Sequence, residues 1–144
     1  MIRWASFRNK NDKFTYKTKV YYKDVDQMGV VYYARYYEYF EAARTELWQS
    51  IDIDVTAVED DGYFMPVVTS HCDYKIGATF EDILLVETFI NELPKATMRI
   101  DYEIYKNKNS DLLVSGYTTH AFTDKSGKPV KPPKRLLEVL QNNF

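Results

Sequence analysis

One uninterrupted segment, VVYYARYYEYFEAARTELW (residues 30–48), restricts the possible folds of this chain most strongly. It contains neither Gly nor Pro and is too long for one strand, so its apolar and aromatic residues predict a single long helix. Apolar side chains occur almost all round its first half, which is typical of a buried helix. Charged residues recur mostly every three positions and leave one face for solvent or a polar partner; they are Arg35, Glu38, Glu41, Arg44 and Glu46. The rest of the chain must therefore cover this helix.

Segments of alternating polar and apolar residues surround the helix and predict strands. The first is FTYKTKVYY (14–22), and four more follow at Phe64–Ile76, Ile83–Glu92, Ala96–Lys106 and Leu112–Thr123. The clearest alternation runs through the third of these four, whose apolar face is formed by Met98, Ile100, Tyr102 and Ile104. Short connectors rich in Gly, Pro, Asn and Asp join the last four strands, which predicts antiparallel neighbours in chain order.

Two further segments complete the expected fold. SIDIDVTAVEDDGY (50–63) predicts a loop with one short turn, and PPKRLLEVLQ predicts a short C-terminal helix that begins at Pro. A curved antiparallel sheet of about five strands must bury one face, and the long helix can cover that face. The predicted fold is therefore α+β, a single domain over residues 1–144 in which residues 1–13 form a flexible arm.

The composition argues against several classes of protein. A chain of 144 residues fits one domain with its own core. The net charge is −2 and no strongly basic stretch occurs, so no nucleic-acid partner is expected. Cys72 is the single cysteine, which excludes a disulfide within the chain and indicates a reducing compartment. No apolar run approaches the length of a membrane span and the N-terminus lacks the apolar core of a signal peptide, so we expect a cytoplasmic protein.

Familiar catalytic and metal-binding motifs are missing from the sequence. His71 and His120 lie within predicted strands, and no nucleophile elbow with Ser is present. A zinc site needs three or four ligands, and two separated histidines with Cys72 do not indicate one. No residue near Cys72 predicts a reactive thiol. Neither a P-loop nor a Rossmann glycine pattern occurs. We therefore expect no metal and no resident cofactor.

Two carboxylates, Asp24 and Asp26, stand directly before the long helix and allow two interpretations. Either one can cap the free N–H groups of the helix N-terminus and complement its dipole. Alternatively, the buried helix N-terminus holds an oxyanion that develops on a substrate carbonyl, while a nearby carboxylate acts as nucleophile or general base. Gly29 would then allow the substrate to approach closely. The residues by themselves leave both interpretations open.

A resemblance favours the second interpretation. The segment YYKDVDQMGVVYYARYYEYFEAAR resembles the signature of the hotdog-fold acyl-CoA thioesterases, of the 4-hydroxybenzoyl-CoA thioesterase type and its Tol–Pal-associated short-chain relatives. The segments MPVVTSHCDYKIGATFEDILLVET and TDKSGKPVKPP are similar to the second strand and the last turn of that family. The resemblance extends over residues 15–140. It implies the hotdog fold and the hydrolysis of an acyl-CoA thioester to a free acid and coenzyme A.

The same resemblance implies roles for individual residues. Asp26 matches the catalytic carboxylate, and Tyr22 matches a tyrosine that helps to position the site. Gly29 and Val30 match the turn into the helix. Tyr33 stands where many relatives have His, but in the hydroxybenzoyl branch an aromatic residue occupies this position and its backbone N–H polarises the thioester carbonyl. The departure therefore argues against short aliphatic substrates more than against thioester cleavage.

The resemblance also implies partners. It predicts a homodimer, often paired into a homotetramer, with active sites at the interface. Coenzyme A enters as part of the substrate, and its nucleotide would lie near basic turn residues. We expect Lys95, Thr97 and Lys131 to contact it. An acyl-carrier protein is an alternative carrier of the acyl group.

Two alternative hypotheses remain at this point. Tyr33 in place of His favours a non-catalytic acyl-CoA-binding protein, and a different branch of the fold would place the catalytic carboxylate on the helix, at Glu38 or Glu41. The acyl group is also open, because several tyrosines near the helix start either line an aromatic-acyl pocket or pack in the core and interface; they are Tyr32, Tyr33, Tyr36 and Tyr37.

Overall fold

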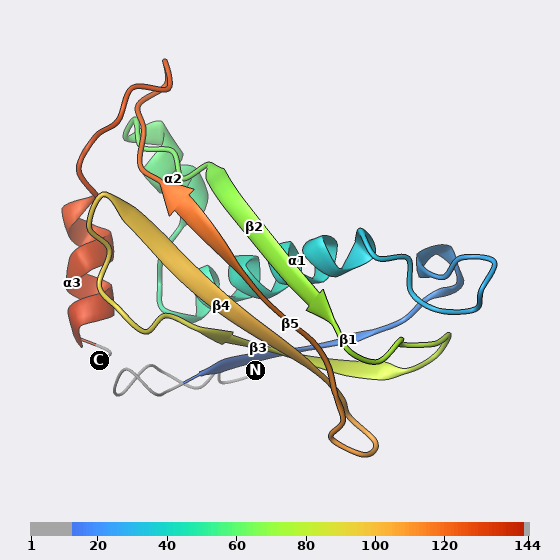
Figure 1. Ribbon diagram of the computed structural model, residues 1–144. Helices are drawn as coiled ribbons and strands as arrows, with labels where there is room; N and C mark the ends of the chain where they lie inside the picture. The colour runs from blue at the N-terminus through green and yellow to red at the C-terminus, as the bar shows by residue number, and fades with distance from the viewer. Residues whose placement is uncertain (1–12, 143–144) are drawn as a thin grey trace.

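A five-stranded antiparallel sheet curves around one long helix in the computed structural model, which describes residues 13–142 (Figure 1). The strands are β1 (Phe14–Lys19), β2 (Val67–Tyr74), β3 (Ile83–Phe89), β4 (Thr97–Lys106) and β5 (Leu112–Ala121). The helices are α1 (Arg35–Ser50), α2 (Val55–Asp60) and α3 (Lys134–Asn142), and a single 3-10 turn covers Tyr22–Asp24. The predicted α+β class with a central helix is confirmed. Of the predicted arm, residues 1–13, all but the last residue lie outside the described part of the chain.

The position of β2 differs from the predicted chain-order arrangement. The sheet order is β1-β3-β4-β5-β2, so β3, β4 and β5 are consecutive neighbours as predicted, but β2 pairs with β5 at one edge. The connector 75–82 therefore crosses from this edge to β3, which pairs with β1 on its other side. It forms no hairpin because its residues bond to other segments: Ala78 accepts from the Val31 N–H, and the Glu81 N–H donates to Val20.

The start of α1 also differs from prediction. The helix begins at Arg35 rather than at Val30. Val30 forms an isolated antiparallel bridge with Thr79, and Val31 forms one with Val25. Branching at Cβ favours extended backbone for both valines, and these bridges satisfy their polar groups outside a helix. The residues just before α1 are therefore a loop fastened to the connector between β2 and β3.

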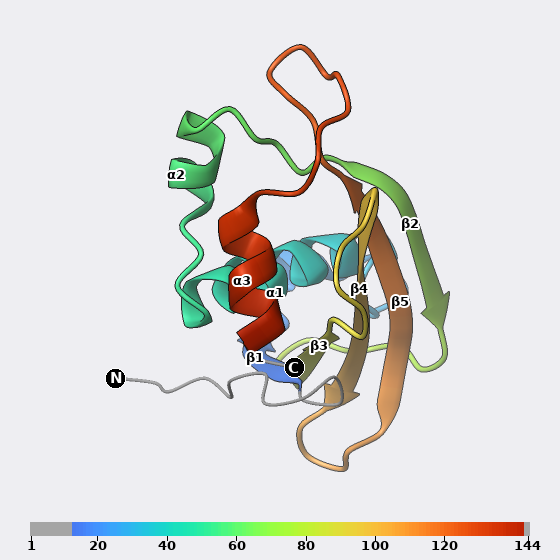
Figure 2. The same cartoon turned by 90° about the vertical axis from the view of Figure 1, so that its left-hand side faces the viewer.

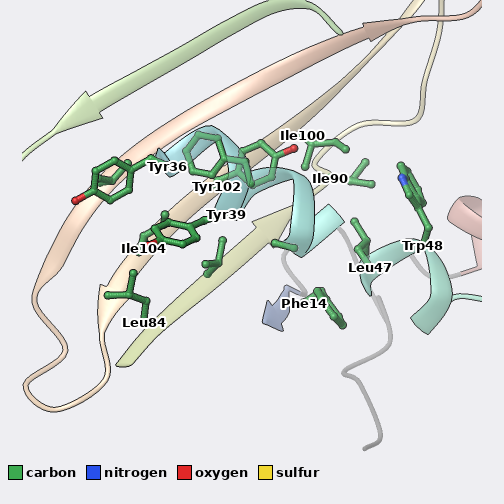
Figure 3. Close-up of a cluster of buried hydrophobic side chains, with 14 of the residues drawn as sticks. Phe14, Tyr36, Tyr39, Leu47, Trp48, Leu84, Ile90, Ile100, Tyr102 and Ile104 are labelled. Carbon is green, nitrogen blue, oxygen red and sulfur yellow. The ribbon is translucent and has the colours of Figure 1, made fainter. Parts of the chain in front are cut away.

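The core lies between α1 and the concave face of the sheet (Figure 3). The buried side chains of α1 are spaced by three or four residues, as expected of a helix that faces a sheet; they include Tyr36, Tyr39, Phe40, Ala43 and Leu47. The predicted apolar face of β4 is confirmed, since Met98, Ile100, Tyr102 and Ile104 are all buried. The Phe40 and Tyr102 rings stack with centroids 4.2 Å apart, which joins α1 to the centre of the sheet.

Gly116 of β5 allows Phe40 to lie flat against the sheet. A Cβ at this position would lie 3.0 Å from two atoms of the Phe40 ring and would clash with the His71 carbonyl oxygen of β2. The glycine is therefore explained by close approach of helix and neighbouring strand, which only a residue without a side chain permits.

The short helices lie on the same side of the sheet as α1 (Figure 2). In α3, which the sequence predicted, Leu136, Val139 and Leu140 are buried. The predicted single turn within residues 50–63 is α2, whose first N–H groups are capped by Asp54 through a 3.3 Å hydrogen bond from the Ala57 N–H. Both helices lie at the opposite end of α1 from the loop that carries Asp26 (Figure 1).

Candidate active site

Asp24 is a buried structural carboxylate. One of its oxygens accepts from the Tyr21 N–H at 2.9 Å and the other from the Lys23 ammonium at 3.0 Å, and the residue is only 2% exposed. Burial alone would raise the pKa of Asp24, but the Tyr21 hydrogen bond and the Lys23 ammonium outweigh it and hold the pKa below its usual value. Burial and the nearby Asp24 charge in turn raise the pKa of Tyr39 on α1. Asp24 thus fixes the 3-10 turn and does not cap α1.

We expect Asp24→Asn to lower the free energy of unfolding by about 1–3 kcal/mol at neutral pH, because two donors lose a buried, charged acceptor. The pKa of Asp24 is lower in the folded than in the unfolded chain, so its contribution is present above the usual value of 3.8 and is lost as the pH falls through the folded value. The free energies of unfolding of the variant and the wild type, measured in urea, should therefore begin to converge below about pH 4.

The matched control for Asp24→Asn is Asp111→Asn, in the exposed loop between β4 and β5. It should unfold like the wild type at every pH. A stability difference for Asp24→Asn that stays the same from neutral to acidic pH would contradict the assigned pKa shift.

Asp26 lies in a small closed loop and keeps one carboxylate oxygen free. Its Oδ1 accepts from the Met28 N–H at 2.8 Å, and its N–H donates to the Val30 carbonyl at 3.0 Å. The Gly29 N–H donates back to the Asp26 carbonyl at 3.0 Å, and Gly29 has φ +81°, which favours glycine. No hydrogen bond within residues 13–142 reaches Asp26 Oδ2, and the side chain is partly exposed. The carboxylate is therefore held in place with one oxygen available.

The N-terminus of α1 has unused backbone donors. Its N-cap, Ala34, has no side-chain cap, so capping by Asp24 or Asp26, the first of the two interpretations of the sequence, is wrong. The Arg35 N–H donates to the Tyr32 carbonyl at 2.9 Å and closes a turn with Tyr33 and Ala34 at its centre. In the described part of the chain, neither the Tyr33 N–H nor the Ala34 N–H donates a hydrogen bond. These two groups can bind an anion at the positive end of the helix dipole.

Aromatic side chains surround this loop. The Tyr32 and Tyr33 rings lie 4.8 Å apart, and the Tyr33 ring meets Tyr74 of β2 edge-on at 6.3 Å. Interaction with the Tyr33 hydroxyl raises the pKa of Tyr32, and the Asp26 charge adds to the shift. The Asp26 charge therefore acts on a tyrosine that lies just before the start of α1.

The other residues expected in the site lie in the same region but have different surroundings. Tyr22 is 79% exposed and packs edge-on against Phe80 at 5.8 Å; no hydrogen bond links it to Asp26. Val30 packs against Gly77, where a Cβ would lie 2.8 Å from Val30 Cγ1. Gly29 has open space around it, since no atom lies within 4 Å of a Cβ placed there.

The residues expected to contact coenzyme A lie at the other end of α1. Lys95 and Lys131 line one cavity of about 1400 Å³ between α2 and α3, whereas Thr97 borders a smaller hollow beside it, which Lys95 also lines. Lys134 and Arg135, which were not predicted from the sequence, line the large cavity as well. Their signal was the cluster of cations at the start of the predicted C-terminal helix. Because α1 has 16 residues, it spans about 24 Å between this cavity and the Asp26 loop.

The remaining candidates have structural surroundings. His71 is exposed, pairs with Asp73 at 3.0 Å and stacks on Tyr117. His120 is buried and lies between the Met65 carbonyl and the Thr118 hydroxyl, and burial lowers its pKa. Burial raises the pKa of the Cys72 thiol. Within residues 13–142, no three His, Cys, Asp or Glu side chains gather as metal ligands, and no helix has the length and apolar character needed to cross a membrane.

The helix-based alternative places its carboxylates in solvent. Glu38 is exposed in the first turn of α1 and forms an ion pair with Arg35 at 2.8 Å, and Glu41 is exposed one turn later. Neither side chain has the fixed, partly buried position that Asp26 has.

Comparisons with known proteins agree with the fold. Residues 20–140 match the sequence profile of the Thioesterase-like superfamily. The acyl-CoA thioesterase YbgC of Haemophilus influenzae is 35% identical over 126 residues, which cover 85% of this chain and 90% of that protein. YbgC of Helicobacter pylori is 30% identical over 132 residues, which cover 86% and 97%. The crystal structure of Slr0204, a 1,4-dihydroxy-2-naphthoyl-CoA thioesterase from Synechocystis, matches with a TM-score of 0.81 at 25% identity over 92% and 95% of the two chains. The chain therefore belongs to the hotdog-fold Thioesterase-like superfamily, as its sequence signature predicted.

Proposed function

We propose that this protein is an acyl-CoA thioesterase that uses Asp26 as its catalytic carboxylate. The observation that carries the proposal is the loop before α1, which combines a fixed carboxylate with a free oxygen and two unused N–H donors. Relatives named as acyl-CoA thioesterases support the reaction class. The single free Cys72 fits a reducing compartment, and we place the reaction in the cytoplasm on that ground.

In the proposed reaction the thioester carbonyl oxygen lies at the α1 N-terminus, near the Tyr33 N–H. Either Asp26 attacks the carbonyl carbon and forms a mixed anhydride that water then cleaves, or Asp26 removes a proton from the attacking water. In both cases the carbon–sulfur bond breaks, water supplies the hydroxyl of the acid, and the thiolate leaves and is protonated. Charge that develops on the carbonyl oxygen is stabilised by the N–H groups and the helix dipole.

The neighbouring residues take supporting roles in this proposal. Gly29 and Val30 shape the turn that holds Asp26, since Gly29 supplies the positive φ and the Val30 carbonyl accepts from the Asp26 N–H. Tyr22, exposed beside Phe80, forms one wall of the entrance to the site. Tyr33 contributes its N–H, so its side chain does not need to be histidine.

The active form that we propose is a homodimer joined through β2. This edge strand is exposed along most of its length and has no partner on its outer side among the described strands. Three exposed apolar residues lie along it, namely Val67, Val68 and Tyr74. An exposed apolar edge strand presents unpaired N–H and C=O groups that favour pairing with another chain. Antiparallel pairing with a second copy would satisfy these backbone groups.

Such a dimer would also bring the two separated sites together. Each β2 has one end near α2 and another end that carries Tyr74. In an antiparallel pair, the α2 end of β2 in one protomer lies beside the Tyr74 end of β2 in its partner. The cavity with Lys95 and Lys131 in one protomer then approaches the Asp26 loop of the second. We propose that these cations, together with Lys134 and Arg135, bind the phosphates of coenzyme A there. Thr97 borders this site from the start of β4.

The dimer proposal predicts that Val68→Asp dissociates the protein and lowers thiol release from acyl-CoA. Val68 is already 56% exposed in the single chain, so a charge there should leave the stability of the monomer nearly unchanged. Sedimentation with parallel activity measurement tests this. Lys17→Asp is the control, since Lys17 is exposed on β1, the opposite edge strand of the sheet. A wild type that is monomeric at full activity would contradict the dimer.

The reaction itself is tested by following thiol release from a panel of aliphatic and aromatic acyl-CoAs and acyl-carrier proteins. We expect many turnovers per protomer with at least one member, and the best substrate will identify the acyl group and its carrier. Stable acyl-CoA binding without thiol release would instead support the non-catalytic binding protein, for which Tyr33 in place of His is the motivating feature.

A further inference from the structure

Tyr74 ties the edge of the sheet to the start of α1. It is the last residue of β2, and its hydroxyl donates to the Tyr33 carbonyl at 3.1 Å. Its ring lies between two tyrosines, with centroid distances of 6.3 Å to Tyr33 and 5.5 Å to Tyr36. Both contacts are edge-on, so the ring is held on two sides and the hydroxyl has a defined direction.

This hydrogen bond acts on a peptide whose N–H is unused. The Tyr33 carbonyl and the Ala34 N–H belong to one planar peptide group, so a donor on the carbonyl fixes the plane and polarises the N–H. The preceding peptide, Tyr32–Tyr33, has the same arrangement. The Arg35 N–H donates to its carbonyl, and its N–H, that of Tyr33, donates no hydrogen bond. Two successive peptides therefore have an occupied carbonyl and an unused N–H, within the part of the chain that the structure describes.

Tyr74 is suited to remain a donor. Partial burial raises the pKa of Tyr74, and interaction with the Cys72 thiol raises it further, so the hydroxyl stays protonated at neutral pH. A protonated phenol donates to the carbonyl without adding negative charge near the oxyanion.

We propose that Tyr74 is a positioning residue that orients the Tyr33–Ala34 peptide, so that the Ala34 N–H joins the Tyr33 N–H as a second oxyanion donor. This inference rests on the proposed thioesterase function. It extends that function by making the site depend on a side chain from the edge strand. Tyr74 does not touch the reacting atoms; it acts through the peptide.

The test is Tyr74→Phe, which removes the hydroxyl and keeps the ring between Tyr33 and Tyr36. We expect kcat for thiol release to fall about three- to tenfold, the effect of one lost hydrogen bond, while KM changes less than twofold. The melting temperature should stay within a few degrees of the wild type. Tyr105→Phe is the matched control, because its hydroxyl also donates one hydrogen bond, to Glu103, on the opposite face of the sheet. It should leave kcat unchanged.

A second measurement separates positioning from a merely structural role. Replacement of Tyr74 by fluorotyrosine keeps the shape and makes the hydroxyl a stronger donor, so kcat should equal or exceed the wild-type value while Tyr74→Phe lies below it. Equal kcat for all three proteins would overturn the inference, as would a loss that appears only in KM or only in melting temperature. Asp26→Asn distinguishes a failure of the Tyr74 inference from a failure of the proposed thioesterase function. If it abolishes turnover while Tyr74→Phe is fully active, the role of Tyr74 alone is wrong; if Asp26→Asn is active, the proposed function itself fails.

Discussion

Asp26→Asn should reduce thiol release by about a thousandfold or more, because an amide can neither attack a carbonyl nor accept a proton from water at neutral pH. The substitution keeps the shape of the side chain, and the amide oxygen can still accept from the Met28 N–H. The fold and the loop should therefore persist, and acyl-CoA should still bind. Initial rates of thiol release at saturating substrate, measured beside the melting temperature, check this expectation.

The choice of control for Asp26→Asn follows from burial. Asp24→Asn is unsuitable, because Asp24 is buried and structural, and any loss of activity would be mixed with a loss of stability. Asp111→Asn makes the same chemical change at an exposed position and should retain full turnover. Turnover of Asp26→Asn within a few-fold of the wild type would mean that the carboxylate lies elsewhere, and Glu38→Gln would then be compared.

Gly116→Ala should have the largest effect on stability, a loss of about 3 kcal/mol in the free energy of unfolding, because the added methyl group overpacks the core. It would meet the His71 carbonyl and the Phe40 ring together, and neither can move without disturbing β2 or α1. Urea unfolding with tryptophan fluorescence measures the change. Ser115→Ala, the neighbouring position on the outer face, is the control and should be close to neutral.

An alanine at Gly116 that leaves the unfolding midpoint unchanged would show that Phe40 does not lie against β5 as described. The same experiment tests the edge strand, since the clash with the His71 carbonyl would displace β2. We therefore expect this variant also to lose dimer stability, whereas Ser115→Ala should not.

Much of the fold could be predicted from local patterns. The alternation in β4 placed Met98 and Ile104 on the buried face correctly, because a strand with one wet face must alternate. The position of β2 could not be predicted, since the connector 75–82 has the Gly and Asp of a turn but is bonded to the segment before α1. Strand pairing is a long-range property, and turn residues report only local backbone geometry.

The helix start shows a similar limit, with consequences for the site. Periodicity extended α1 back to Val30, but Val30 forms a bridge with Thr79 of the connector and Val31 forms one with Val25. Tyr33 therefore precedes the helix instead of lying inside it. Its N–H consequently makes no helical hydrogen bond to the carbonyl four residues earlier. The sequence could name the oxyanion position from the resemblance, but only the structure explains why the donor is free.

The two aspartates are separated by their surroundings rather than by their spacing. The sequence favoured Asp26 only through the family signature, whereas the structure shows Asp24 buried with both oxygens bonded and Asp26 partly exposed with one oxygen free. Tyr74 gave no signal in the sequence, because its partner is a backbone carbonyl 41 residues away.

The most direct test of the account is a crystal structure of Asp26→Asn with the acyl-CoA that the wild type hydrolyses fastest. We expect the thioester carbonyl oxygen within about 2.7–3.1 Å of the Tyr33 N–H, with the side chain at position 26 facing the carbonyl carbon. We also expect the coenzyme A phosphates at Lys131 and Lys134 of the second protomer. A thioester bound away from the start of α1, with its carbonyl facing Glu38 or solvent, would contradict the account.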